Sequence, residues 1–173
     1  AVGAMEARLD AIDEPHPAIE LGLQWLRSRC DAVAAAYAEV PVHGDFRVGN
    51  LMVNEHDLVA VLDWEFAHWG DPAEDLGWLL VRAWRFGADE RRLGGIGDVE
   101  PFLEHYNRLT GRGITPEQLA FWEVLGNVRW AIGSLNQARR HLSGQERSIE
   151  LAVLGRLACE IEFEILTLCS ALA

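Results

Sequence analysis

The chain has 173 residues, of which 50% are hydrophobic, and a formal net charge of -12. This length allows one domain with a substantial core, and the hydrophobic fraction excludes a disordered chain. The negative charge argues against broad nucleic-acid binding, which needs a basic surface; it serves solubility, and it also favours a cationic substrate.

In chain order, residues 1–15 are mostly polar and predict a loose lead-in. Pro17 suits a first helical turn, and the apolar residues of Ala18–Tyr37 lie near one face, so we expect a helix there that Pro41 stops. From Leu51 to Leu62, two short apolar runs flank a polar turn, which predicts a β-hairpin.

The next stretch predicts helices joined by a loop. Pro72 begins a helix over about Ala73–Phe86, and the glycine-rich segment Gly87–Asp98 predicts a loop. A short helix is then expected over Val99–Thr110, ended by Gly111.

Two longer helices are predicted to complete the chain. Thr115, with Gln118 three residues on, fits a capping box for a helix that runs to about Arg140. A last helix is expected over Glu146–Leu172. The fold class is therefore mainly α (α+β), a single domain over 1–173 that carries one small hairpin.

The cysteines and the termini predict a cytoplasmic protein that does not span a membrane. Cys30, Cys159 and Cys169 lie far apart and lack metal-ligand spacing, which favours reduced thiols. The N-terminus has no basic stretch followed by an apolar run, so a signal peptide is not expected. Charged residues interrupt the apolar stretch 149–173, which argues against a membrane span.

The most informative block of the sequence is the run HGDFRVGN at 43–50, followed by DWE at 63–65. It places Asp45 on a loop before the first strand of the hairpin, where a carboxylate can accept the proton of an attacking hydroxyl. Asn50 and Asp63 stand at either end of the hairpin, and their oxygens can hold magnesium on phosphates. The hairpin brings these positions together, which predicts a phosphoryl-transfer site.

Most residues around this block are expected to hold its loop and the following helix in place rather than to take part in the reaction. Arg47 can neutralise charge on the moving phosphate or form a salt bridge to an acidic neighbour, and both interpretations stay open. His43 is expected to fix the loop backbone by hydrogen bonding. Asp71 is expected to cap a helix and Asp75 to anchor a loop, while Glu65 either contacts the substrate or caps the following turn.

The runs HGDFRVGN and AVLDWE, with the trailing GDPAEDLGWLL, resemble the signature of the aminoglycoside phosphotransferase and choline-kinase-like family. This family is a branch of the protein-kinase-like fold, and the strong match covers about Val42–Leu80. The resemblance implies ATP and Mg²⁺ as cofactors, Asp45 as the catalytic base, and Asn50 and Asp63 as the magnesium ligands. It also implies the helical C-terminal lobe of that fold and a small hydroxyl-bearing acceptor, such as an aminoglycoside or an amino alcohol.

One feature of that family is not found in the sequence. Kinases of this type have an N-terminal lobe with a glycine-rich loop and a strand lysine that grip the nucleotide. Nothing before Pro41 has this pattern, and the chain contains no lysine. We therefore expect this chain by itself to bind ATP poorly and to turn over little.

Two other classes of function remain as alternatives. The chain can be a catalytically inactive lobe that self-associates through the apolar surface left open by the missing N-terminal lobe, which gives a homo-oligomer. It can also be a metal-dependent hydrolase built on His43, Asp45 and Asp63, although no histidine cluster for two metals is evident.

Overall fold

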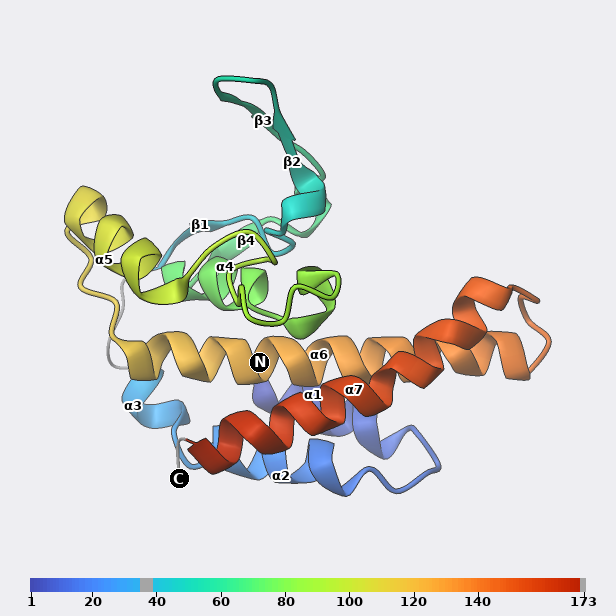
Figure 1. The fold of residues 1–173 in the computed structure, drawn as a ribbon. Coiled ribbons are helices and arrows are strands. Elements are labelled where there is room, and N and C mark those ends of the chain that lie inside the picture. Colours follow the sequence, from blue (N-terminus) through green and yellow to red (C-terminus); the bar gives the residue numbers. More distant parts are fainter. Residues whose placement is uncertain (35–38, 172–173) are drawn as a thin grey trace. The chain divides into compact units, whose positions relative to one another are not determined.

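The computed structural model describes residues 1–34 and 39–171 of the chain (Figure 1). One domain was expected over the whole chain. Within the structure, the contacts group the residues into two compact units, Ala1–Cys30 with Val124–Ala173, and Asp31–Glu123. We call these the first and the second unit.

The first unit is helical. It contains α1 (Val2–Asp10), α2 (Pro17–Arg27), the C-terminal part of α6 (Pro116–Leu142) and α7 (Ile149–Ala171). Helix α2 packs against α1 and α7. A Cβ on Gly22 would lie 2.8 Å from Ile165 Cγ2 and 3.1 Å from Val128 Cγ2, so only glycine allows this close approach of α2.

The prediction of a loose lead-in over residues 1–15 is wrong, because Val2–Asp10 forms a helix. Val2, Met5 and Leu9 are buried at spacings of three and four residues, the spacing of one helical face. A helix of nine residues with three buried positions is too short for this pattern to stand out from sequence alone.

The helix expected over Ala18–Tyr37 is shorter than predicted. It ends at Arg27, where Ser28 Oγ donates to the Trp25 carbonyl at 2.7 Å, and a separate helix α3 covers Cys30–Ala34. Serine competes with helical hydrogen bonding in this way, which explains the break. Tyr37 lies outside the described residues, as does Leu172, the predicted end of the last helix.

The described part of the second unit holds two small antiparallel sheets. Strands β2 (Leu51–Val53) and β3 (Leu58–Val61) form the predicted hairpin, and Asn54 Oδ1 accepts from the backbone N–H of His56 and Asp57 in its turn. Figure 1 shows this hairpin standing away from helices α4 and α5.

The second sheet was not predicted. It pairs β1 (Val40–Val42) with β4 (His68–Gly70), with Val42 opposite His68. Each strand has only three residues and the two lie far apart in sequence, so neither shows a recognisable alternating pattern. This sheet closes the segment that contains the whole HGD to DWE block, because β1 precedes the block and β4 follows it.

The helix predicted over Ala73–Phe86 is in fact two elements. Helix α4 covers Pro72–Leu79, and a separate 3₁₀ turn covers Arg82–Arg85. Arg85 donates to the Leu80 carbonyl at 3.0 Å, which satisfies a carbonyl at the helix end. The predicted helix α5 (Val99–Thr110) is confirmed, and Gly111 ends it with a φ of 66°.

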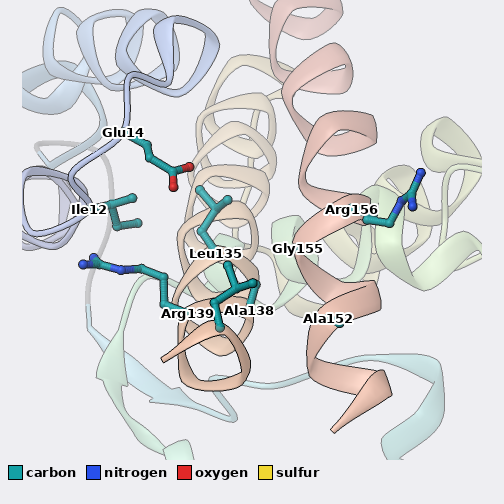
Figure 2. Close-up of a pocket in the computed structure, with 9 residues that line it drawn as sticks. Ile12, Glu14, Leu135, Ala138, Arg139, Ala152, Gly155 and Arg156 are labelled. Atoms are coloured by element: carbon teal, nitrogen blue, oxygen red, sulfur yellow. The ribbon is translucent and has the colours of Figure 1, made fainter. Parts of the chain in front are cut away.

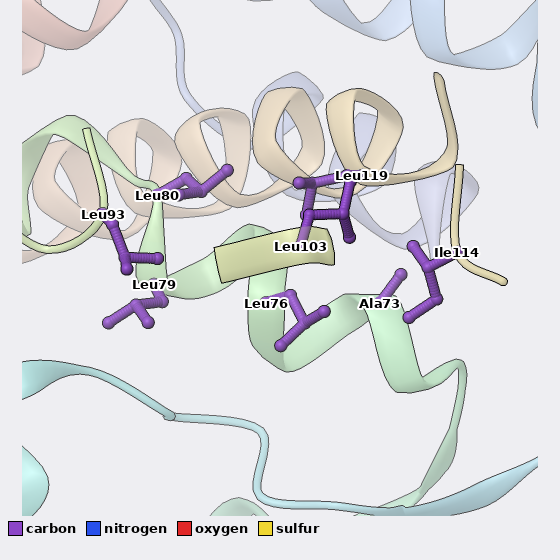
Figure 3. Packing of buried hydrophobic residues seen from close by; sticks show 8 residues of the cluster. All are labelled: Ala73, Leu76, Leu79, Leu80, Leu93, Leu103, Ile114 and Leu119. Atoms are coloured by element: carbon purple, nitrogen blue, oxygen red, sulfur yellow. The ribbon is translucent and has the colours of Figure 1, made fainter. Parts of the chain in front are cut away.

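An aliphatic cluster holds α4 in place within the second unit (Figure 3). Its buried members come from α4 and its C-cap, the glycine-rich loop, α5, the segment before α6 and the start of α6: Ala73, Leu76, Leu79, Leu80, Leu93, Leu103, Ile114 and Leu119. Burial of such side chains contributes roughly 1.5–3 kcal/mol each to folding. Helix α4 is therefore a fixed support for whatever contacts its other face.

The capping box predicted at the start of α6 forms only in part. Thr115 Oγ1 accepts from the Gln118 backbone N–H at 3.2 Å, but the Gln118 side chain donates to Asp71 instead of returning to the cap. Hydrogen bonds from its own backbone N–H and from the Thr115 hydroxyl lower the pKa of Glu117. Thr115 Oγ1 and the Glu117 carboxylate therefore accept hydrogen bonds from backbone N–H groups in the first turn of α6.

No helix within residues 1–34 and 39–171 combines the length and the apolar character that crossing a bilayer requires.

We expect Gly77→Ala to destabilise the protein by roughly 1–3 kcal/mol, because the new methyl group would overpack a contact between α4 and α6. A Cβ on Gly77 would lie 2.5 Å from Trp122 Cβ and 2.7 Å from the Glu123 backbone nitrogen. Urea denaturation measures the change. Gly133→Ala is the matched control, since a Cβ there meets nothing within 4 Å. It should stabilise α6 by about 1 kcal/mol through helix propensity, and equal midpoints for the two variants would contradict the close contact.

Candidate functional site

The loop that follows β1 turns sharply at Gly44. Gly44 has a φ of 78°, and a Cβ there would lie 2.4 Å from the Phe66 carbonyl oxygen. Only glycine adopts this conformation and fits this space without strain. The turn directs His43 inward, where it is buried, and places Asp45 at the start of the loop.

Asp75 holds the first two residues of this loop. Its carboxylate accepts from the backbone N–H of His43 at 2.7 Å and of Gly44 at 2.9 Å. Asp75 lies on α4, so these bonds attach the loop to the helix that the aliphatic cluster supports. The expectation that Asp75 anchors a loop agrees with this geometry.

Both ring nitrogens of His43 are engaged. Nδ1 accepts from the Asp45 backbone N–H at 3.2 Å, so the ring proton lies on Nε2, which donates to the Leu62 carbonyl at 2.8 Å. The ring also packs on Trp64, with 4.6 Å between ring centroids. His43 therefore ties the loop to the end of the hairpin through both of its ring nitrogens, which is the backbone-fixing role expected for it.

Asn50 and Asp45 are joined directly. The Asn50 side-chain nitrogen donates to the Asp45 backbone carbonyl and to Asp45 Oδ2, both at 2.8 Å. The amide nitrogen faces Asp45 because Asp45 offers only acceptors there. Asn50 is buried, and both of these bonds use its amide nitrogen, so neither occupies the amide oxygen, which is a type of ligand that Mg²⁺ prefers.

Two further side chains contact the Asp45 carboxylate. Trp78 Nε1 donates to Oδ1 at 2.7 Å, and Arg47 Nε lies 3.4 Å from Oδ2. The Arg47 guanidinium also lies over the Trp84 ring, 5.0 Å from its centroid. The structure thus shows the salt-bridge interpretation of Arg47, and it adds Trp78 and Trp84 to the site.

Neither Trp78 nor Trp84 was among the predicted site residues. The one available signal was that Trp78 lies three residues after Asp75, on the same face of α4.

Asp63 is brought to the loop by backbone hydrogen bonds. The Leu62 N–H donates to the Asn50 carbonyl at 2.8 Å, and the next residue, Asp63, has a left-handed backbone with a φ of 67°. Non-glycine residues in this conformation cluster at functional sites. Asn50 and Asp63 therefore offer an amide oxygen and a carboxylate, a sparse set that fits Mg²⁺, which keeps phosphate and water ligands.

The remaining predicted residues lie outside this group of contacts. Glu65 is exposed on the 3₁₀ turn Trp64–Phe66. Asp71 caps α4 by accepting from the Ala73 N–H at 2.8 Å, as predicted, and it also accepts from Gln118 and from Trp122 Nε1. Asp71 therefore joins α4 to α6 and has a structural role.

The second unit has a cleft of about 440 Å³ that Phe46 and Asp75 help to line. It lies next to the loop, because Phe46 directly follows Asp45. Burial raises the pKa of Tyr106 in this cleft, and the charge of Arg112 opposes part of that rise.

The first unit has a pocket of about 250 Å³ formed by the segment after α1 and by helices α6 and α7. Figure 2 shows Ile12 and Glu14 on one side of Leu135, and Gly155 of α7 on the other. None of the residues from His43 to Glu65 lines this pocket.

The sequence matches a known family over most of its length. The model of the phosphotransferase enzyme family matches residues 2–122. A mouse protein, acyl-CoA dehydrogenase family member 10, is 30% identical over 152 residues, which cover 82% of this chain and 14% of that protein.

The fold is also that of a known structure. The crystal structure of a candidate aminoglycoside phosphotransferase from Ralstonia eutropha JMP134 matches with a TM-score of 0.76 and 24% identity. The match covers 98% of this chain and 54% of that one, so the chain spans about half of the solved protein. The predicted fold class, the helical lobe of a protein-kinase-like fold, is confirmed.

We expect Asp75→Asn to loosen the start of the loop, because the new amide group would turn a donor toward one of the two backbone N–H groups. The loss of a hydrogen bond to a charged group should cost roughly 1.5–3 kcal/mol. Amide hydrogen exchange at His43 and Gly44 should accelerate. Glu74→Gln, one residue away and paired with His68, is the control and should leave both amides protected. Unchanged protection in Asp75→Asn would show that other contacts hold the loop.

Proposed function

Because the chain belongs to the phosphotransferase enzyme family, we propose that its site transfers the γ-phosphate of ATP to a hydroxyl of a small molecule. The observation that carries this proposal is the bond from the Asn50 amide nitrogen to Asp45 Oδ2 at 2.8 Å. It joins the base to a magnesium ligand, so that the hydroxyl and the phosphates can be positioned by one rigid group.

Asp45 acts as the base in this proposal. The acceptor oxygen forms a bond to the γ-phosphorus while the bond from that phosphorus to the bridging oxygen of ADP breaks. The hydroxyl proton passes to the Asp45 carboxylate late in this step. The hydrogen bonds from Asn50 and Trp78 hold the carboxylate ready for the incoming hydroxyl.

Asn50 Oδ1 and the Asp63 carboxylate are the proposed magnesium ligands. These two groups would hold a Mg²⁺ ion, which would supply positive charge against the phosphates of the nucleotide. Within the described part of the chain, no group of three or more His, Cys, Asp or Glu residues is placed to hold a metal by itself. The proposed site therefore depends on the nucleotide for most of its metal ligands.

Arg47 has a second role in this proposal. Its guanidinium pairs with Asp45 at 3.4 Å, a long contact that a phosphate group can replace. We expect Arg47 to turn toward the transferred phosphate when the nucleotide binds, while the Trp84 ring continues to support its planar group.

The acceptor is proposed to carry an amino group, as an aminoglycoside or an amino alcohol does. The net charge of -12 favours a cationic substrate, and the exposed Glu65 carboxylate, two residues after Asp63, can pair with its ammonium group. The three free cysteines and the use of ATP suit a cytoplasmic location.

This chain by itself should bind ATP weakly. The described residues before β1 form helices α1, α2 and α3, so they do not supply the glycine-rich hairpin that covers a nucleotide in kinases. The sequence also has no lysine for the nucleotide phosphates. Activity assays therefore need saturating ATP and a sensitive label.

We expect Asp45→Asn to lower phosphate transfer about 10²- to 10⁴-fold, the usual contribution of a general base. Transfer of labelled γ-phosphate from ATP to a panel of aminoglycosides and amino alcohols measures this effect. Asp57→Asn in the exposed turn of the hairpin is the charge-matched control and should retain activity. Full activity of Asp45→Asn would remove Asp45 from its role.

The magnesium ligands can be tested without turnover. We expect Mn²⁺ with ATP to broaden the NMR signals of the Asn50 side-chain amide and of the Asp63 backbone amide before those of other residues. Asp63→Asn should weaken this broadening, since one charged ligand is lost. Broadening centred on another acidic cluster would place the metal elsewhere.

A second candidate function is self-association. Apolar side chains are exposed on the hairpin and the segment after it: Met52, Val53, Leu58, Val59, Leu62, Trp64, Phe66 and Trp69. An exposed apolar surface of this kind favours association. Sedimentation velocity should then show a dimer that Leu58→Ser weakens, whereas a monomer at all concentrations tested would count against an interaction module.

A further inference from the structure

Helix α4 contacts the loop through two side chains that lie one turn apart. Asp75 holds the backbone of His43 and Gly44, and Trp78 donates to Asp45. Residues three apart on a helix share a face, so α4 presents both groups to the loop at once. The helix therefore controls the path of the loop and also the orientation of the Asp45 side chain.

We propose that Trp78 is a positioning residue for Asp45, and that its indole N–H fixes which carboxylate oxygen receives the acceptor's proton. This inference rests on the proposed function, because it assigns a role in that reaction. The indole Nε1–H lies 2.7 Å from Asp45 Oδ1. Since an indole N–H can only donate, it matches an ionised carboxylate and cannot compete for the acceptor's proton.

The surroundings of Trp78 make this contact rigid. Its side chain is only 8% exposed, and its ring packs against Trp84 with 5.5 Å between the centroids. A buried indole held on two sides cannot easily turn its N–H elsewhere, and a hydrogen bond in such a place is stronger than one in water.

The side chains that donate hydrogen bonds to the Asp45 carboxylate are divided unevenly between its two oxygens. Oδ2 receives the Asn50 amide at 2.8 Å and Arg47 at 3.4 Å, while Oδ1 receives Trp78. A carboxylate offers about four acceptor positions, two on each oxygen. Oδ1 therefore keeps one position for a hydroxyl, and the acceptor should bind next to the Trp78 indole.

The test compares Trp78→Phe with wild type in the transfer assay. Phenylalanine keeps an aromatic ring and removes the N–H donor. We expect kcat to fall roughly 10- to 100-fold, since misplacement of a catalytic group by about 1 Å has an effect of that size. KM for ATP should stay the same, because the proposal assigns Trp78 a contact with Asp45 and none with the nucleotide.

Three controls separate positioning from a general structural effect. Trp25→Phe on α2 is a matched substitution in the first unit and should leave kcat unchanged. In the Asp45→Asn background, Trp78→Phe should cause no further loss of activity, because Trp78 acts through Asp45. The indole N–H signal of Trp78 in ¹⁵N NMR spectra should shift in Asp45→Asn, and this readout needs no activity.

The possible outcomes distinguish the inference from the proposed function. Absence of transfer by wild type with every acceptor would overturn the proposed function, and this inference with it. Measurable transfer that Trp78→Phe leaves undiminished would overturn the positioning role alone. An additional loss in the Asp45→Asn background, or an indole signal indifferent to that substitution, would also overturn it.

Discussion

The carboxylate of Asp75 makes the contact on which the rest of the site depends. It binds two consecutive backbone N–H groups, those of His43 and Gly44, and so holds the first turn of the loop against α4. Unpaired N–H groups in this partly buried turn would be costly, and a carboxylate from an adjacent helix satisfies both. Every later contact of the loop starts from this fixed position.

From that position the site is built as a closed set of hydrogen bonds. His43 reaches the end of the hairpin at Leu62, Asn50 binds Leu62 through its backbone and Asp45 through its side chain, and Trp78 completes the set from α4. The chain returns to the sheet β1–β4 at His68. The proposed base Asp45 and the proposed magnesium ligand Asn50 are thereby held in one hydrogen-bonded group, and positioning of this kind is what phosphoryl transfer requires of a protein.

Local patterns in the sequence were enough to predict some structural elements of this protein and not others. The β2–β3 hairpin, helix α5 and the cap at Asp71 depend on neighbouring residues, and their prediction was correct. Sheet β1–β4 depends on pairing between short distant segments, which no local pattern encodes. The ends of the predicted helices over 18–37 and 73–86 were wrong because single side-chain contacts, from Ser28 and Arg85, decide where those helices stop.

The sequence by itself determined the family of this protein and the residues proposed for its chemistry. The spacing of Asp45, Asn50 and Asp63 around a hairpin indicated the family, since these residue types and intervals follow from the reaction. Only the tertiary structure decided which groups orient Asp45. Trp78 reaches it across 33 positions of sequence, and a tryptophan on an apolar helix is indistinguishable from a core residue until the fold shows where its N–H points.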